Sequence, residues 1–372
     1  MADLNTNSAP DREYMRRQLG SKRWWDGLRA VQAGTGKATI MWVGDSVGTG
    51  SGAGTGGSNT NARVSNIFSQ IKGLFVAAGF PCQDDSFYGT SGYATLADIT
   101  DYDPRLTFSG VGWAIDSTGV ISSRNFRNNN VDTTSLINFQ TVGSVDTVEI
   151  ATLRNGAGSI DILIDDVLNT TITPSASLAV NRTVISGLSL APHKISFRRA
   201  SGDVRVLGAK AYSASRACIE FVNISASGAQ MTSYGSTTNP YSPGFAITGQ
   251  NADLALCNLG INDAKAAVTN DVYSVACRQV ATAQLAAGGD MLFLGPNRFD
   301  TALVAGNIQE NFEATMKGIA AGGNCDFLSM SAVLGLFATA NSNGDMADQT
   351  HPNSQGAGKL AAAIYNRIKL PA

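Results

Sequence analysis

Hydrophobic positions follow one pattern near the two ends of the chain and a different one in its middle. Short, mostly apolar runs that end at polar or glycine-containing turns occupy residues 38–43, 218–222, 254–258, 291–294 and 326–329. Runs of this kind are typical of strands that are buried on both faces of a parallel sheet. Both ends of the chain therefore predict strands of such a sheet.

Stretches with helical character lie before, between and after these runs. They occupy residues 11–32, 62–78, 271–287, 308–321 and 354–368. In the first of them Trp24, Trp25 and Leu28 are available for burial. Strands that alternate with helices in this way predict an α/β fold in which helices cover a parallel sheet.

The middle of the chain, from about residue 105 to residue 212, has short alternating runs instead. Ile160, Ile162 and Ile164 alternate with polar residues, and turn signals such as Asn155-Gly156 separate the runs. Such spacing predicts a β-sandwich. We expect residues 1–104 to form an N-terminal helix and the first part of the α/β domain. Residues 105–213 would be an inserted β-sandwich, and residues 214–372 the remainder of the α/β domain.

Composition narrows the possible functions. The 372 residues include 27 Lys and Arg and 29 Asp and Glu, with no basic tract, which gives no support for nucleic-acid or membrane-surface binding. No apolar run approaches the length of a membrane span, and the N-terminus does not resemble a signal peptide. The five cysteines form no CxxC pair. We therefore expect buried thiols and folding in a reducing cytoplasm.

Four polar motifs follow one another along the predicted α/β domain. They are Gly44-Asp45-Ser46, the segment 223–228 that ends in Gly228, Gly260-Ile261-Asn262-Asp263, and the segment 348–352 that contains Asp348 and His351. Together they supply a nucleophile, hydrogen-bond donors for an oxyanion, and an acid three residues before a base. Hydrolysis of an ester by acyl transfer needs this set of groups.

Each member of the set can be assigned a role. Ser46 follows a predicted strand, at the sheet edge where ligands of open α/β sheets bind. The chain has two histidines; His193 lies in an alternating β pattern, so His351 is the candidate base, with Asp348 to orient it. The candidate oxyanion donors are the Asn262 amide and the backbone N–H groups of Ser46 and Gly228.

A second glycine competes with Gly228 for the role of backbone donor. Gly92, in Thr90-Ser91-Gly92-Tyr93, lies earlier in the chain, whereas Gly228 follows a predicted strand and precedes Asn262. We favour Gly228. This choice places the β-sandwich between the first and the second motif.

The four motifs, in this order, resemble those of the SGNH (GDSL-type) hydrolases. The resemblance covers residues 37–98 and 218–372 and leaves the β insertion outside. It implies a three-layer α/β/α sandwich, catalytic roles for Ser46, Asp348 and His351, and a structural role for Asp45. It also implies that neither a metal nor a cofactor is needed. Val47 departs from the Leu that is commonest in the first motif, a modest apolar change.

The inserted β-sandwich, jelly-roll-like in expectation, resembles carbohydrate-binding modules, and the whole arrangement looks like esterases of bacteriophage tail proteins. The resemblance implies removal of O-acetyl groups from a polysaccharide. Tyr234 and Tyr241 are candidate contacts with sugar faces or else packing residues, and Arg298 is a candidate contact with an anionic glycan. A lipase or thioesterase with a longer acyl pocket is the alternative enzyme. A non-catalytic glycan-binding adhesin or virion protein is the alternative outside enzymes, and homo-oligomeric assembly stays open.

Overall fold

The computed structural model describes residues 21–116, 124–129, 132–174, 180–236, 244–304, 306–322 and 325–371. One part of the fold is a six-stranded sheet in which every pair of neighbours is parallel. Its spatial order is β15 (Cys325–Ser329), β14 (Asp290–Gly295), β13 (Leu254–Asn258), β1 (Ala38–Gly44), β12 (Ile219–Asn223) and β2 (Cys82–Gln83). Every residue of β1, β13 and β14 is buried, which explains why these strands are continuous apolar runs.

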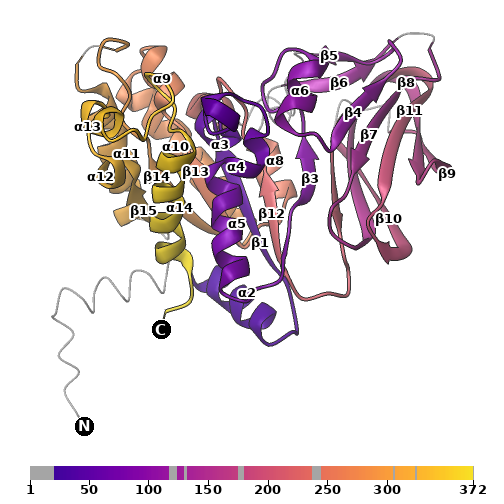
Figure 1. The fold of residues 1–372 in the computed structure, drawn as a ribbon, viewed down its shortest axis with the longest axis horizontal. Coiled ribbons are helices and arrows are strands. Elements are labelled where there is room, and N and C mark those ends of the chain that lie inside the picture. Colours follow the sequence, from indigo (N-terminus) through magenta and orange to yellow (C-terminus); the bar gives the residue numbers. More distant parts are fainter. Residues whose placement is uncertain are drawn as a thin grey trace.

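Helices cover both faces of this sheet, and the three-layer α/β/α arrangement that the sequence predicts is confirmed (Figure 1). α5 (Ile67–Ala77) and α14 (Ser354–Ile368) pack against each other on one face. α8 (Gly244–Gly249), α10 (Asn270–Ala286) and α11 (Ile308–Gly322) pack together on the other. The amino-terminal α2 (Lys22–Gln32) buries Trp24, Trp25 and Leu28, as predicted. The predicted start of this helix, residues 11–20, lies outside the described residues.

The second part of the fold is a curled antiparallel sheet of nine strands (Figure 1). β8 (Val145–Ile164) and β11 (Lys194–Tyr212) pair along most of their length, and the other seven strands pair with them directly or through a neighbouring strand. Those strands are β3 (Asp85–Tyr88), β4 (Leu106–Ser109), β5 (Ala114–Asp116), β6 (Asn125–Asn128), β7 (Leu136–Gln140), β9 (Val167–Ile172) and β10 (Val180–Ala191). The sheet curls around an apolar core that includes Phe126, Phe139, Ile162 and Phe197. We call this part the β unit.

The β unit begins earlier than residue 105, where the sequence pattern places its boundary. β3 pairs with the last part of β11, and α6 (Leu96–Tyr102) adds Ile99 and Tyr102 to the core of the β unit. A strand of four residues shows too few alternations to be recognised, and its partner lies more than a hundred residues away in the chain. The two main-chain crossings into and out of the β unit therefore follow β2 and precede β12.

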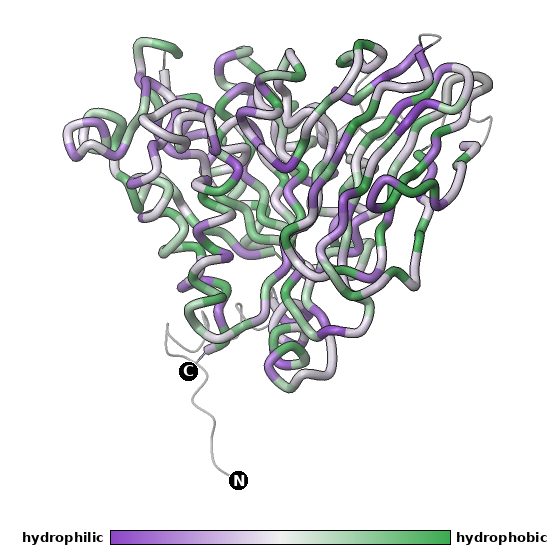
Figure 2. The backbone as a smooth tube through the Cα atoms, turned by 45° about the vertical axis from the view of Figure 1, so that its right-hand side comes forward, coloured by the Kyte–Doolittle hydropathy of each residue, from purple (hydrophilic) through white to green (hydrophobic). Residues whose placement is uncertain are grey.

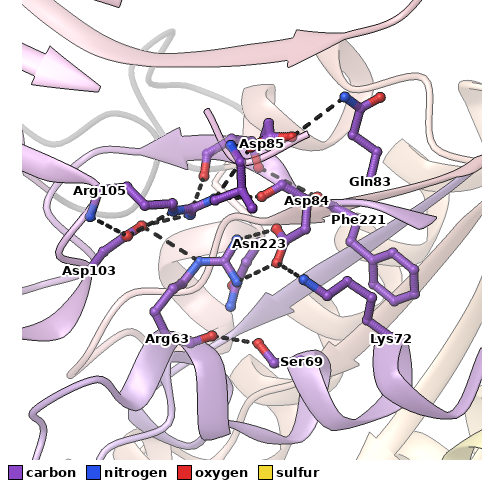
Figure 3. Close-up of polar contacts among 12 residues, drawn as sticks. Arg63, Ser69, Lys72, Gln83, Asp84, Asp85, Asp103, Arg105, Phe221 and Asn223 are labelled. Carbon is purple, nitrogen blue, oxygen red and sulfur yellow. Dashed lines mark hydrogen bonds and ion pairs between the residues drawn. The ribbon is translucent and has the colours of Figure 1, made fainter. Parts of the chain in front are cut away.

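The two parts share a packed junction rather than a flexible linker. Tyr88, Leu153 and Leu207 of the β unit belong to the apolar core of the α/β part. Beside them lies a buried cluster of charges, shown in Figure 3, in which Arg63 pairs with Asp84 and Arg105 pairs with Asp103. The side chains of Arg63 and Asp84 are only 5% and 7% exposed. Charges buried to this degree are stable only when they are paired.

Hydropathy follows this architecture. Figure 2 shows hydrophobic segments along the strands of the parallel sheet and within the curl of the β unit. No helix among the described residues is both long and apolar enough to cross a lipid bilayer.

Candidate active site

The turn after β1 presents Ser46 at the carboxyl edge of the parallel sheet (Figure 1). β1 ends at Gly44, and the short helix α3 (Ser46–Thr49) begins at once. The Asp45 carboxylate caps it by accepting a hydrogen bond from the Val47 N–H at 2.9 Å. A Cβ at Gly48 would lie 2.3 Å from the Trp42 ring nitrogen, so this turn has room only for glycine there. Ser46 itself is 6% exposed.

His351 and Asp348 complete a chain of hydrogen bonds with Ser46. His351 Nε2 lies 2.8 Å from Ser46 Oγ, and His351 Nδ1 lies 2.8 Å from Asp348 Oδ2. The other carboxylate oxygen, Asp348 Oδ1, accepts hydrogen bonds from the backbone N–H groups of Thr350 and His351 at 2.7 and 2.8 Å. The structure thus brings together the three residues that the sequence selects as nucleophile, base and acid.

The environment of Asp348 favours its ionised form. Partial burial alone would raise the pKa of Asp348, but the hydrogen bonds from the His351 side chain and from the loop backbone lower it. A carboxylate that stays charged can hold the proton on His351 Nδ1. This leaves Nε2 as the acceptor for the Ser46 hydroxyl proton.

Two residues that the sequence analysis does not select hold the loop that carries His351. Asn297 is 1% exposed and donates from Nδ2 to the Thr350 carbonyl oxygen at 3.0 Å. Lys265 Nζ donates to Thr350 Oγ1 at 3.0 Å. A signal for Asn297 does exist in the sequence: it follows the buried strand β14 closely, and so lies at the same sheet edge as Ser46.

The candidate oxyanion donors come from two loops at this edge. The loop after β12 is tied to the nucleophile turn by a hydrogen bond from the Ala226 N–H to the Gly44 carbonyl at 3.0 Å. Asn262, in α9 (Ile261–Lys265), donates from Nδ2 to the Ala229 carbonyl at 3.0 Å, which leaves its second amide proton for a ligand. The Gly228 N–H has no hydrogen-bond partner among the described residues.

Gly92 and Gly228, which the sequence presents as competitors, lie beside the same loop. Gly228 has φ +82° and no atom within 4 Å of an added Cβ, so its outer face is open. Gly92 instead packs on the residue before Gly228, because a Cβ at Gly92 would lie 2.5 Å from Ser227 N. The Gly228 N–H is therefore accessible to a ligand, whereas Gly92 packs against the loop that carries Gly228 and supports it.

Asp263, next to Asn262 in α9, links α9 to the segment that follows the Gly228 loop. It is 0% exposed and accepts a hydrogen bond from the Met231 N–H at 2.8 Å. Burial raises the pKa of Asp263. Burial, and to a lesser degree the negative charge of Asp263, raises the pKa of the buried Asp45 carboxyl to about 7.

Two of the three candidate substrate contacts are not supported by the structure. Tyr234 is 2% exposed and donates its hydroxyl to the Ile224 carbonyl, so it is a packing residue. Arg298 is paired with Glu313 at 2.9 Å and Glu310 at 3.6 Å, so its guanidinium is already neutralised by carboxylates and is not available to an anionic glycan. Of the two alternatives for Tyr234, the structure favours packing, and sequence alone shows neither the burial of Tyr234 nor the ion pairs of Arg298. Tyr241 lies outside the described residues.

Among the described residues, no group of three or more His, Cys, Asp or Glu side chains could hold a metal ion. The five cysteines are free thiols.

The sequence matches no protein-family model and no curated protein. The structure is similar to a family two carbohydrate esterase from Clostridium thermocellum in complex with cellohexaose, with 12% identity, a TM-score of 0.31, and coverage of 76% of this chain and 98% of that chain. A carbohydrate esterase family 2 enzyme with a carbohydrate binding domain from Corynascus thermopiles (Myceliophthora fergusii) has 15% identity and a TM-score of 0.30, over 63% of this chain and 92% of that one.

A GDSL-like lipase from Bacteroides ovatus has 11% identity and a TM-score of 0.30, over 64% of this chain and 87% of that chain. At these identities and TM-scores the likeness carries no argument about the activity of this chain. The site must therefore be interpreted from its own geometry.

Proposed function

We propose that this protein is a serine esterase of the SGNH type that forms an acyl-enzyme on Ser46. One observation carries the proposal: Ser46, His351 and Asp348 form a continuous hydrogen-bond chain, although Ser46 and His351 are 305 residues apart in the sequence. A serine, an imidazole and a carboxylate in this order are what acyl transfer to a hydroxyl requires.

In the first half-reaction Ser46 Oγ attacks the carbonyl carbon of the ester while His351 Nε2 takes the hydroxyl proton. The carbonyl oxygen becomes an oxyanion, which accepts hydrogen bonds from the N–H groups of Ser46 and Gly228 and from the Asn262 amide. The bond to the alcohol then breaks. The leaving oxygen takes the proton from His351, and the acyl group remains on Ser46.

In the second half-reaction a water molecule attacks the acyl carbon and gives its proton to His351 Nε2. Asp348 stabilises the imidazolium in both half-reactions through Nδ1. Collapse of the second tetrahedral intermediate releases the carboxylic acid and returns the proton to Ser46 Oγ. Each proton transfer in both half-reactions passes through His351 Nε2.

We further propose that the substrate is an O-acetyl group on a polysaccharide. The family resemblance and the inserted β unit motivate this choice, and the 6% exposure of Ser46 is compatible with a short acyl group. Association with a virion, after folding in the cytoplasm, belongs to the same proposal.

The test is acetate release from a panel of acetylated polysaccharides, run beside p-nitrophenyl acetate, with wild type and Ser46→Ala. We expect release from at least one glycan by wild type and none by the variant. Cleavage of the aryl ester without release from any glycan would keep the mechanism and contradict the substrate. Hydrolysis that persists in Ser46→Ala, or is absent from wild type, would refute the proposed mechanism.

A further inference from the structure

We infer that the turn of residues 90–93, which the β unit supplies, positions the backbone N–H of Gly228 for the oxyanion. The inference rests on the proposed function and gives the β unit a part in the active site itself. The residues of this turn do not touch the reacting atoms, so they are positioning residues.

The turn and the Gly228 loop meet backbone to backbone. The Ser227 N–H donates to the Ser91 carbonyl at 2.9 Å. A Cβ at Gly92 would lie 2.5 Å from Ser227 N and 2.6 Å from Ser227 O. Contacts this short leave no room for a side chain, so glycine at position 92 is what permits the approach.

The contact also sets the direction of the Gly228 N–H. The Ser227 carbonyl and the Gly228 N–H belong to the same peptide unit, and in a trans peptide these two groups point in opposite directions. Gly92 packs against the Ser227 carbonyl. The Gly228 N–H must therefore point away from the turn, on the side where the loop is exposed.

The turn is held in an unusual conformation by the β unit. Ser91 and Gly92 have φ values of +52° and +87°, and a non-glycine residue keeps such a value only where its surroundings fix it. The Thr90 hydroxyl donates to the Tyr93 carbonyl at 3.0 Å, and the Tyr93 N–H donates to the Thr90 carbonyl at 3.0 Å. The Tyr93 ring packs on Tyr102, with ring centroids 5.0 Å apart.

The same turn reaches the nucleophile from the other side. The Tyr93 hydroxyl is buried without a hydrogen-bond partner among the described residues, and burial raises its pKa, while the nearby hydroxyls of Ser51 and Thr49 act against that rise. Thr49 ends α3, the short helix that Ser46 begins. One turn of the β unit thus contacts the loop of the candidate donor and lies near the segment that carries the candidate nucleophile.

The experiment compares Gly92→Ala with Gly79→Ala. Both glycines have φ +87°, but an added Cβ at Gly79 has no atom within 4 Å, so Gly79→Ala reproduces the backbone strain without the contact. With p-nitrophenyl acetate we expect kcat of Gly92→Ala to fall by about 10²-fold, within the range for loss of one oxyanion donor. KM and the pH midpoint of kcat should stay at their wild-type values, as should kcat of Gly79→Ala.

Equal kcat values for Gly92→Ala and Gly79→Ala would overturn the inference. A second readout, amide hydrogen exchange of Ser227, does not depend on turnover. It should be faster in Gly92→Ala than in Gly79→Ala, and equal exchange would show that the turn does not fix this peptide. Absence of Ser46-dependent turnover in wild type is a distinct result, because it removes the proposed function and with it the catalytic role of the turn.

Discussion

Asp45 places an ionisable group directly beside the candidate nucleophile, where no step of the proposed mechanism uses it. One of its carboxylate oxygens accepts a hydrogen bond from Val47, and the other has no partner among the described residues. Burial raises the pKa of Asp45 to about 7, although the Val47 hydrogen bond and the charge of Lys265 partly offset it. Asp45 therefore helps to shape the nucleophile turn, and its burial there makes the ionised form of its carboxyl less stable.

This cost predicts how stability depends on pH. The unfolded pKa is near 3.8 and the folded pKa near 7, so between these values the folded state holds a proton that the unfolded state lacks. The contribution of Asp45 to the free energy of unfolding should then fall as pH rises through this window. Asp45→Asn should flatten the slope, measured by urea denaturation at several pH values. The raised pKa of Asp290, about 6, is common to both proteins, so parallel slopes would contradict the assignment to Asp45.

Asn262 allows a direct test of the oxyanion site. Asn262→Ala should lower kcat on p-nitrophenyl acetate by about 10²- to 10³-fold, because one donor to the developing charge is lost. The free energy of unfolding should fall by only about 1 kcal/mol, since the one side-chain hydrogen bond that breaks is that to the Ala229 carbonyl. Asn262→Asp keeps the shape and places an acceptor where a donor is needed, so it should be at least as inactive. Activity retained by both variants would exclude the amide as a donor.

The sequence predicts those site residues whose role can be inferred from the residues directly around them in the chain. Ser46, Asn262 and His351 each lie in a short motif next to an element boundary, and their roles can be proposed without a structure. Asn297 and Gly92 act through contacts with Thr350 and Ser227, which lie far from them in the chain. No local pattern contains such contacts.

At the scale of elements the same distinction holds. β13 and α14 have the predicted bounds, because a buried apolar run and a long amphipathic pattern are each complete within the element. The predicted helix 62–78 is in fact two helices, α4 (Ala62–Ser65) and α5. Asn66 ends the first and caps the second by accepting from the Ser69 N–H at 2.8 Å, while its amide donates to the Thr49 carbonyl. The break is thus caused by a capping residue that also supports the nucleophile segment.

A second pH-dependent contact joins the turn between β10 and β11, which carries His193, to the turn between β8 and β9, which carries Asp165. His193 Nδ1 lies 2.7 Å from Asp165 Oδ2, and Nε2 lies 2.7 Å from the Ser189 carbonyl. Both partners are acceptors, so both ring nitrogens are best used when each carries a proton. Burial alone would lower the pKa of His193, but the Ser189 carbonyl and Asp165 raise it above its ordinary value.

The sign of the effect follows from linkage. The stabilisation from His193 should be complete below its unfolded pKa of about 6.5 and be lost as pH rises through the higher folded pKa. We expect the melting temperature of wild type, relative to that of His193→Gln, to decline from pH 6 towards pH 8. The slope should be that of about one proton taken up by the folded state and not by the unfolded state. Scanning calorimetry of both proteins measures this difference. A constant difference across the range would show that the imidazole does not titrate with folding.

For the whole molecule, the change from helical to alternating hydrophobic periodicity predicts that a β unit is inserted. It does not predict where this unit lies relative to the candidate active site. The changed hydrophobic periodicity indicates a β structure within the α/β chain, but it does not indicate which surface of the α/β part this structure packs against. In the structure the β unit shares apolar core with the α/β part through Leu153 and Leu207, and it places the 90–93 turn against Ser227. The candidate active site is therefore built from both parts of the chain.

The buried charges at the junction give the last prediction (Figure 3). Arg63 holds Asp84 ionised: burial alone would raise the pKa of Asp84, and Arg63 with Lys72 lowers it. Removing Arg63 leaves the buried Asp84 carboxylate paired only with the partly exposed Lys72, at 3.2 Å, so Arg63→Met should cost up to about 3–5 kcal/mol of unfolding free energy. Removing both charges relieves this penalty, so Arg63→Met combined with Asp84→Leu should be less destabilised than Arg63→Met alone.

Urea denaturation of wild type, the two single variants and the double variant measures this coupling. Additive single effects would mean that the pair contributes packing alone and that its charges are screened at the junction. A strong coupling would instead place the docking of the β unit under electrostatic control. Because Asp84 immediately precedes β3, and the 90–93 turn follows that strand within two residues, Arg63→Met should also lower kcat on p-nitrophenyl acetate, and the double variant should recover part of it.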